Sequence, residues 1–413
     1  MKYIQIKNLI ENGDAEIRTG PFGTQLKASE YVKIGTPVLN VKNLGYANVI
    51  KEKIDNVNED TLNRLSIHKL RKGDIVFGRK GAVERHAFIT DRENGWMQGS
   101  DCIRLRIISE LYNPRFLSYY FLTDKHKRFM EMMCSHGTTM ASLNQKIIEQ
   151  ISFPSPEREV QDLIVDFLEK LDSKIEVNKQ INDNLEQQAL SLFRQYFMDY
   201  APYGGAAPID WRDVSLDDVC TRITDGSHYS PTDSPESPYP MYSVKDMETY
   251  GFNSTSCKHI TEDEFRKMQR NDCVPLLNDI LVAKDGSYLK EIFICSEAKN
   301  EAILSSIAIF RPNISVVMPE ILLYLLKQPS VRKDVGDNYV SGSALPRIVL
   351  KDFKKYRFKL PPMVEQLKIG AVLHKIRMKT KANIDEINKL SLLRDTLLPK
   401  LMSGELDISD VAV

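Results

Sequence analysis

The sequence predicts an α+β protein in which two similar mixed α/β domains are separated by two long helices, with the helices forming an antiparallel coiled coil and a pseudo-twofold arrangement. Three observations support this fold class. The two halves of the 413-residue chain come into register at an offset of about 205 residues, each half ends in a long helical stretch, and both stretches carry apolar residues at seven-residue spacing.

The repeat is the first of these observations. The run Thr36-Pro37-Val38-Leu39 answers Tyr239-Pro240-Met241-Tyr242, and the offset then holds over more than a hundred residues. At its start, Thr19-Gly20-Pro21-Phe22-Gly23 aligns with Thr224-Asp225-Gly226-Ser227-His228. Further matched pairs are Asp74 with Asp279, Gly81 with Gly286, Pro114 with Pro319, Tyr119 with Tyr324, Gly137 with Gly342 and Gln161 with Gln366. The chain is therefore interpreted as an internal duplication.

Each copy follows the same order of elements. Short β-like runs are expected at 36–41, 74–78 and 102–107, and at 239–244, 279–284 and 303–310. A helix follows at 115–134 and at 320–334, and a proline-marked boundary then leads into the long helices, 157–199 and roughly 363–398. The predicted domains are 1–156, a central long helix at 157–200, a second domain at 201–361, and a C-terminal long helix and tail at 362–413.

The long helices share a column of heptad positions. These are Ile164, Leu171, Asn178, Leu185 and Leu192 in the first helix, and Ile369, Ile376, Asn383, Leu390 and Leu397 in the second. Seven-residue spacing is typical of a coiled-coil seam, and a polar residue in the seam can set register. Antiparallel packing of the two helices would place Asn178 and Asn383 close together. The alternative is that each helix packs only on its own domain.

The charge distribution bears on the kind of partner. The chain has 56 basic and 56 acidic residues, but residues 1–156 carry 23 basic against 17 acidic residues (net +6), whereas 157–200 carry 5 against 10 (net −5). Residues 201–361 carry 20 against 22, which is not a basic surplus. The sequence shows neither a signal peptide nor a membrane span, and its six cysteines form no CxxC pair. A cytoplasmic chain with reduced thiols is expected.

The chain resembles the specificity (S) subunits of type I restriction-modification enzymes over essentially its full length. The resemblance rests on Thr19–Leu26 leading into Pro37–Asn43, on Lys72–Gly81, on the proline-marked entry to each helix and on the closing segment Leu393–Leu406. It implies two target-recognition domains that each read one half of a split, asymmetric DNA sequence. It also implies that the helices form an antiparallel spacer and dock methyltransferase subunits.

Under this resemblance, candidate DNA contacts are chosen by comparing the two copies, because shared features suit scaffold or phosphate contact and differing polar residues suit base readout. Solvated surface lysines and ordinary turn residues are the competing interpretation for each of them. The candidates are Lys42, Asn43, Lys69, Arg71, Lys72, Arg79, Lys80, Arg85, Thr138 and Thr139 in the first copy, and Lys245, Lys284, Ser287, Lys290, Ser341 and Ser343 in the second.

The resemblance also implies the partners. These are double-stranded DNA, methyltransferase (modification) subunits, expected to be two, and restriction (translocase/nuclease) subunits, with no membrane involved. The chain itself is expected to bind no cofactor and no metal. S-adenosylmethionine, ATP and magnesium are expected on the partner subunits.

No catalytic residue is expected. The sequence lacks an Asn/Asp-Pro-Pro-aromatic methyltransferase motif, a GxGxxG loop and a GxxxxGK[ST] loop. One alternative is a metal-dependent DNA nuclease that uses Asp285 and Glu297 beside Lys299. The first copy has Lys80, Arg92 and Asn94 at those places, which speaks against it. A second alternative is a protein adaptor that does not bind DNA.

Overall fold

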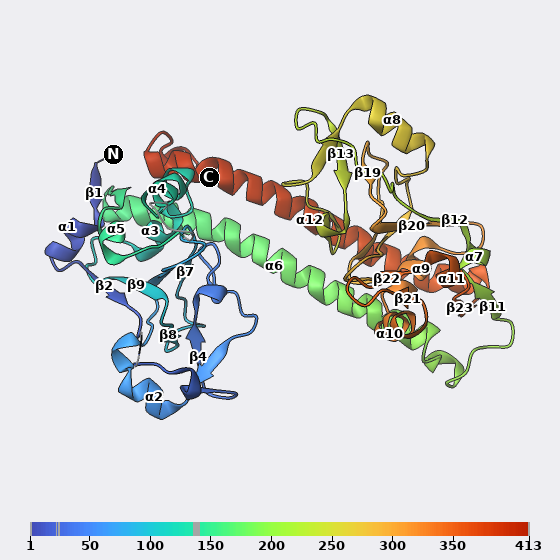
Figure 1. Ribbon diagram of the computed structural model, residues 1–413, viewed down its shortest axis with the longest axis horizontal. Coiled ribbons are helices and arrows are strands. Elements are labelled where there is room, and N and C mark those ends of the chain that lie inside the picture. Colours follow the sequence, from blue (N-terminus) through green and yellow to red (C-terminus); the bar gives the residue numbers. More distant parts are fainter. Residues whose placement is uncertain (1, 22, 24, 135–140, 412–413) are drawn as a thin grey trace. The chain divides into compact units, whose positions relative to one another are not determined.

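The computed structural model describes residues 2–21, 23, 25–134 and 141–411, which divide into two compact units (Figure 1). Unit 1 comprises Met1–Glu176 and Glu386–Val413, and unit 2 comprises Val177–Asp385. The long helices α6 (Arg158–Phe197) and α12 (Met363–Ser403) each contribute to both units. Both units contain strands and helices, as the sequence predicts. The domain limits given above remain predictions. No helix among the described residues is long and apolar enough to span a membrane.

Unit 1 is built on an antiparallel four-stranded sheet with the order β2-β9-β6-β7. A second sheet has the order β3-β5-β4-β8, in which β4 and β8 run parallel, and β1 pairs with β10. The strands are β1 Tyr3–Gln5, β2 Ala15–Thr19, β3 Tyr31–Val32, β4 Thr36–Leu39, β5 Asp55–Val57, β6 Ile75–Gly78, β7 His86–Phe88, β8 Met97–Gln98, β9 Cys102–Ile107 and β10 Ser152–Pro154.

Most helices of unit 1 pack with the first sheet in its main hydrophobic core, to which Phe77, Leu105 and Phe116 contribute. The helix Glu59–Arg64 instead packs its Leu62 with the second sheet. The helices are α1 Ile6–Glu11, α2 Glu59–Arg64, α3 Pro114–Tyr120, α4 Asp124–Cys134 and α5 Gln145–Glu149, with 3₁₀ turns at η1 Ala28–Glu30, η2 Val41–Asn43, η3 Ser66–His68 and η6 Ile408–Asp410. The sequence predicts one helix at 115–134, which is wrong. The helix is interrupted between α3 and α4. There the buried Thr123 hydroxyl donates to the carbonyl of Tyr120 and accepts from the backbone N–H of His126, at the start of α4.

Unit 2 repeats this plan. Its central sheet has the order β12-β20-β17-β18, a second sheet has the order β16-β13-β19 with β13 and β19 parallel, and β11 pairs with β23. The strands are β11 Arg212–Ser215, β12 Cys220–Asp225, β13 Tyr239–Tyr242, β14 Met247–Glu248, β15 Gly251–Phe252, β16 Lys258–Ile260, β17 Ile280–Ala283, β18 Ile292–Ile294, β19 Ala302–Ile303, β20 Ile307–Pro312, β21 Val340–Ser341, β22 Arg347–Ile348 and β23 Arg357–Leu360.

The helices of unit 2 follow the same order as those of unit 1. They are α7 Leu216–Val219, α8 Glu262–Arg270, α9 Pro319–Leu326, α10 Pro329–Asn338 and α11 Leu350–Phe353, with 3₁₀ turns at η4 Ala201–Tyr203 and η5 Val244–Asp246. Here too the single helix predicted at 320–334 is two helices, because Pro329 starts α10 and cannot continue α9. Helix α12 contains Gly370, whose bare Cα allows close approach to Met318.

A buried aspartate opens the central strand of each unit and fixes the same contacts. Asp74 pairs with Arg106 through two oxygens at 2.6 and 2.7 Å, and Asp279 pairs with Arg311 at 2.8 and 2.9 Å. Both aspartates are fully buried. Removing one partner of such a pair would leave an uncompensated buried charge, so these shared residues serve the scaffold.

The shared glutamines fasten each long helix to its own unit. The Gln161 amide donates to the carbonyls of Leu111 and Pro156 at 3.2 and 2.9 Å, and its oxygen accepts from the backbone N–H of Asn113. Gln366 makes the equivalent three bonds in unit 2. Sequence matching found these positions, and the structure gives their physical reason.

Within each unit, segments of α6 and α12 contact one another. In unit 1, Asp172 pairs with Arg394 at 2.9 Å and Lys174 with Glu386 at 3.6 Å, so partner numbers fall along α12 as they rise along α6. In unit 2, the Asn383 amide donates to Asn182 Oδ1 at 2.8 Å. Asn182 lies one turn beyond the predicted partner Asn178, and all three asparagines are buried.

One interaction of the helices is inverted between the units. In unit 1, Arg115 on α3 pairs with Glu169 and Asp172 on α6 at 3.1 and 3.8 Å. The corresponding residues in unit 2, at the offset of 205, are Glu320, His374 and Arg377. Glu320 contacts His374 at 2.7 Å and Arg377 at 3.1 Å. In unit 1 the domain supplies the basic residue and the helix segment the acidic ones. In unit 2 the domain supplies the acidic residue and the helix segment the basic ones.

Candidate nucleic-acid interface

In unit 1, several backbone segments meet where the central strand β6 ends. The backbone N–H of Arg79 donates to the carbonyl of Asp101 at 2.8 Å, and the carbonyl of Arg79 accepts from Leu143 at 2.8 Å. The N–H of Gly20 donates to Cys102 at 2.8 Å. We call this meeting point the loop edge of unit 1, formed by residues 19–21, 79–81, 99–102 and 141–145.

Unit 2 builds its loop edge with the same bonds. The N–H of Lys284 donates to Ser306 at 2.9 Å, its carbonyl accepts from Ile348 at 3.0 Å, and the N–H of Gly226 donates to Ile307 at 3.1 Å. The loop edge of unit 2 is formed by residues 225–227, 284–286, 304–307 and 346–348. The two backbone frameworks correspond bond by bond.

Two glycines permit this close packing of backbone. A Cβ on Gly20 would lie 1.9 Å from the carbonyl oxygen of Gly99, and one on Gly226 would lie 2.3 Å from that of Ile303. Gly226 thus occupies the place of Gly20, and Asp225 that of Thr19. The sequence alignment, which set Thr224 against Thr19, is wrong by one residue here. A β-bulge between Cys220 and Arg222 adds the extra residue.

The candidate cations between residues 69 and 80 of unit 1 form two groups at opposite ends of β6. Arg79 and Lys80 follow the strand and lie on the loop edge. Lys69, Arg71 and Lys72 precede it and are exposed, with Lys72 paired to Asp91 at 2.8 Å. The sequence places these residues within a short span, but the strand between them carries the chain from one end of the sheet to the other.

Two further predicted cations lie near the loop edge of unit 1. Arg85 precedes β7, and its guanidinium lies 5.4 Å from the ring centroid of Tyr46. Lys42 belongs to η2, which packs against the end of β6, and its exposed ammonium group pairs with Asp55 at 2.7 Å. Both side chains keep substantial exposure, which suits contact with phosphate.

Asn43 has a structural place instead. Its side chain is fully buried, and its amide donates to the carbonyls of Ile50 and Glu52 at 3.0 Å each. The corresponding Asp246 is also buried and accepts from the backbone and hydroxyl of Ser243. We therefore leave Asn43 out of the DNA-binding surface.

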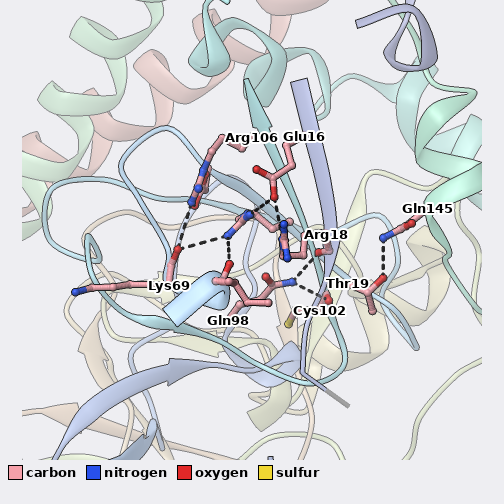
Figure 2. A network of polar contacts seen from close by, with 11 residues as sticks. Glu16, Arg18, Thr19, Lys69, Gln98, Cys102, Arg106 and Gln145 are labelled. Carbon is pink, nitrogen blue, oxygen red and sulfur yellow. Dashed lines mark hydrogen bonds and ion pairs between the residues drawn. The ribbon is translucent and has the colours of Figure 1, made fainter. Parts of the chain in front are cut away.

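A network of arginines lies along β2 and β9 of unit 1 (Figure 2). The Glu16 carboxylate accepts from Nε of Arg18 and from Nη2 of Arg104, each at 2.8 Å. Burial favours the neutral acid, but the hydrogen bond from Arg18 and the charges of three arginines lower the pKa of Glu16 below its ordinary value. Arg104, which is buried, also donates to the carbonyl of Ile67 at 3.1 Å.

Glutamines extend these contacts to the loop edge (Figure 2). Gln98 donates to the carbonyls of Arg18 and Cys102 at 2.9 and 3.1 Å, and Gln145 donates to the hydroxyl of Thr19 at 3.0 Å. Sequence reasoning missed this network. Its signal is the alternation of Arg104 and Arg106 with apolar residues in β9, which is typical of a strand with one polar face.

In unit 2, the predicted contacts are mostly exposed, with one exception. Lys284 is buried and its ammonium group pairs with Asp225 at 2.6 Å, so it stabilises the loop edge rather than facing solvent. The exposed residues are Lys245, Ser287, Lys290, Ser341 and Ser343. In unit 1, Thr138 and Thr139 lie outside the described residues.

The family follows from a comparison with known proteins. A model described as the type I restriction modification DNA specificity domain matches residues 15–187 and again residues 208–391, which together make up most of the chain. The chain belongs to this family. The double match also agrees with the internal duplication and with the two similar units.

Specificity subunits of several organisms resemble the chain. It is 22% identical over 404 residues to the type I restriction enzyme HindI specificity subunit of Haemophilus influenzae, covering 82% of this chain and 87% of that protein. It is 23% identical over 377 residues to the MjaIX specificity subunit of Methanocaldococcus jannaschii, covering 86% and 83%. The type I S subunit from M. genitalium shares the fold, with a TM-score of 0.55, 16% identity and coverage of 97% and 96%.

Members of the specificity-subunit family are non-catalytic recognition subunits, which confirms the expectation that the chain is not an enzyme. The nuclease alternative also lacks geometric support. Asp285 lies near Lys284 and Arg347, whereas Glu297 pairs with Lys299 and Lys381. Among the described residues, no group of three or more histidine, cysteine or acidic side chains is placed to hold a metal ion.

Proposed function

We propose that this specificity subunit reads a bipartite double-stranded DNA target, with each unit recognising one half through its loop edge. The observation that carries the proposal is the pair of matching backbone frameworks that bear different side chains. Thr19 and Ser142 stand in one edge where Asp225 and Arg347 stand in the other. A constant frame with variable polar groups suits two domains that bind similar backbones and different bases.

We further propose that α6 and α12 form an antiparallel coiled coil that acts as spacer and docking site for methyltransferase subunits. All ten predicted heptad positions are buried or half-buried, which supports a shared seam. Apolar side chains are also exposed along both helices, and such surfaces are typical of protein interaction sites. They are Leu163, Val177 and Ile181 on α6, and Val364, Leu367, Val372, Met378, Leu392 and Leu393 on α12.

The proposed partners complete the complex. They are two methyltransferase subunits and, where a restriction complex forms, the restriction subunits. S-adenosylmethionine, ATP and magnesium are assigned to these partners, because the chain carries no motif for them. The specificity subunit supplies recognition and the partners supply the chemistry.

Selection from a randomised duplex library by the assembled methyltransferase complex tests the function. We expect enrichment of two specified blocks of bases separated by an unspecified run of fixed length. Binding should also weaken steeply with salt. A flat binding curve against every duplex would favour the protein adaptor, and DNA cleavage by the purified chain with magnesium alone would favour the nuclease.

A further inference from the structure

A short hairpin in unit 2 places three polar residues in one row. Strands β21 and β22 pair with Ser341 opposite Arg347, and Arg347 in turn forms a β-bridge with Asp285 in the turn after β17. Hydrogen bonds from Gly286 to the carbonyl of Pro346 and from Ile348 to that of Lys284, at 2.7 and 3.0 Å, fasten the hairpin to the turn. Arg347 and Asp285 thus belong to the loop edge of unit 2, and Ser341 extends the row beyond it.

The same bridge exists in unit 1 with the charges rearranged. Lys80 there forms a β-bridge with Ser142, and these residues correspond to Asp285 and Arg347. Each loop edge therefore presents an exposed cation at this bridge, but on opposite strands. The cation of unit 2 is Arg347, with a side chain that is 54% exposed, and not the buried Lys284.

The carboxylate of Asp285 is 13% exposed and lies between two cations. Its Oδ1 is buried without a hydrogen-bond partner, and the nearest cations are Nε of Arg347 at 3.7 Å and Nζ of Lys284 at 3.9 Å. A carboxylate oxygen that is buried without a hydrogen bond costs free energy, and such costs are concentrated at functional sites. At 3.7 Å, the carboxylate attracts the Nε side of the Arg347 guanidinium by charge, without a hydrogen bond.

We propose that Arg347 reads a guanine in the half-site recognised by unit 2, and that Asp285 positions it. A guanidinium held from its Nε side presents two terminal nitrogens outward as a planar fork. This fork matches the O6 and N7 acceptors of guanine in the major groove, which is the commonest base-specific contact of arginine. The inference rests on the proposed DNA-recognition function.

The test uses the complete methyltransferase complex and the target selected by the wild-type complex. We expect R347A to weaken binding to that target by roughly 10- to 100-fold, while binding to unrelated duplex and the slope of log affinity against log salt stay unchanged. Replacing one guanine of the half-site should abolish the difference between R347A and wild type. R266A is the matched control, since Arg266 is equally exposed at 54% but lies on α8.

Two more variants separate base reading from simpler roles. R347K keeps the positive charge but cannot form the fork, so it should lose discrimination almost as far as R347A does. D285N should weaken target binding less than R347A, and should have no further effect in the R347A background. Thermal unfolding of each variant shows whether unit 2 still folds.

The outcomes distinguish failure of the proposed function from failure of the assignment of Arg347. If the wild-type complex selects no sequence, the proposed function itself fails. If it selects a target but R347A binds like wild type, or R347K retains full discrimination, or R347A weakens all duplexes alike, the assignment of Arg347 to guanine is overturned. A selected target without guanine in that half-site overturns it as well.

Discussion

At the scale of single residues, unit 1 contains two histidines that burial keeps neutral. Burial lowers the pKa of both His86 and His126 to about 3, and the nearby charge of Arg115 adds to the effect at His86. His126 packs against the ring of Phe121 at 4.7 Å. Glu291 and Val331 occupy the corresponding places in unit 2, so this feature belongs to one copy alone.

These histidines predict acid lability of unit 1. The unfolded chain takes up their protons below a pH of about 6.5, whereas the folded chain does so near 3, so their contribution is intact above 6.5 and is lost as the pH falls between these values. H126V replaces this histidine with the residue found at the corresponding place in unit 2. At pH 5 it should regain about 2 kcal/mol of the free energy of unfolding that the wild type loses on acidification. Unfolding midpoints measured from pH 7.5 to 5 should fall less steeply than in wild type. An unchanged pH slope in H126V, matching the exposed-site control H228A, would contradict this.

The glycines of the loop edges predict a steric effect. G226A places a methyl group 2.3 Å from the carbonyl oxygen of Ile303, so the backbone must shift. We expect a destabilisation of about 1–3 kcal/mol by chemical denaturation, together with weaker DNA binding by the complex. The control is G251A in the same unit, where a Cβ meets nothing within 4 Å. Equal behaviour of the two variants would argue against the close packing.

At the scale of elements, the inverted ion pairs match each helix segment to its own domain. Glu320 has a side chain that is 4% exposed, and its partners His374 and Arg377 lie on α12. Since Arg115 takes the place of Glu320 in unit 1, a helix segment moved onto the other domain would meet like charges. The inversion thus favours one assignment of helix segments to domains in a duplicated chain.

A charge exchange in unit 2 tests this. E320R places a cation beside Arg377 and should cost about 3–5 kcal/mol, because it breaks a buried pair. The double variant E320R/R377D recreates the arginine–aspartate pair of unit 1 and should recover most of that loss in denaturant unfolding. If the double variant loses as much free energy of unfolding as E320R and R377D lose together, the two residues are not energetically coupled.

At the level of single elements, the sequence predicted more of the scaffold than of the loop edges. Matching the halves located β4, β6, β9 and their counterparts, because buried strands are short apolar runs. It could not detect the bulge at Cys220–Arg222, since a bulge depends on pairing with β20 and leaves no local composition signal. That single extra residue shifted the alignment by one position at Gly226.

At the scale of the whole molecule, the proposed function requires electrostatic attraction between DNA and the loop edge of unit 1. R79A/K80A removes two cations from this edge and should weaken binding to all sequences alike, reducing the slope of log affinity against log salt by roughly 2. Titration of target and unrelated duplexes at several salt concentrations measures this. A loss confined to one target sequence would instead assign these residues to base readout.

The central claim is that two similar loop edges read two different halves of one target. Mapping of methylated bases in genomic DNA exposed to the assembled methyltransferase complex tests it most directly. We expect one asymmetric motif, made of two specified blocks separated by a constant number of unspecified bases. The G226A variant should relax recognition in one block only. A single continuous motif, or G226A relaxing both blocks equally, would contradict it.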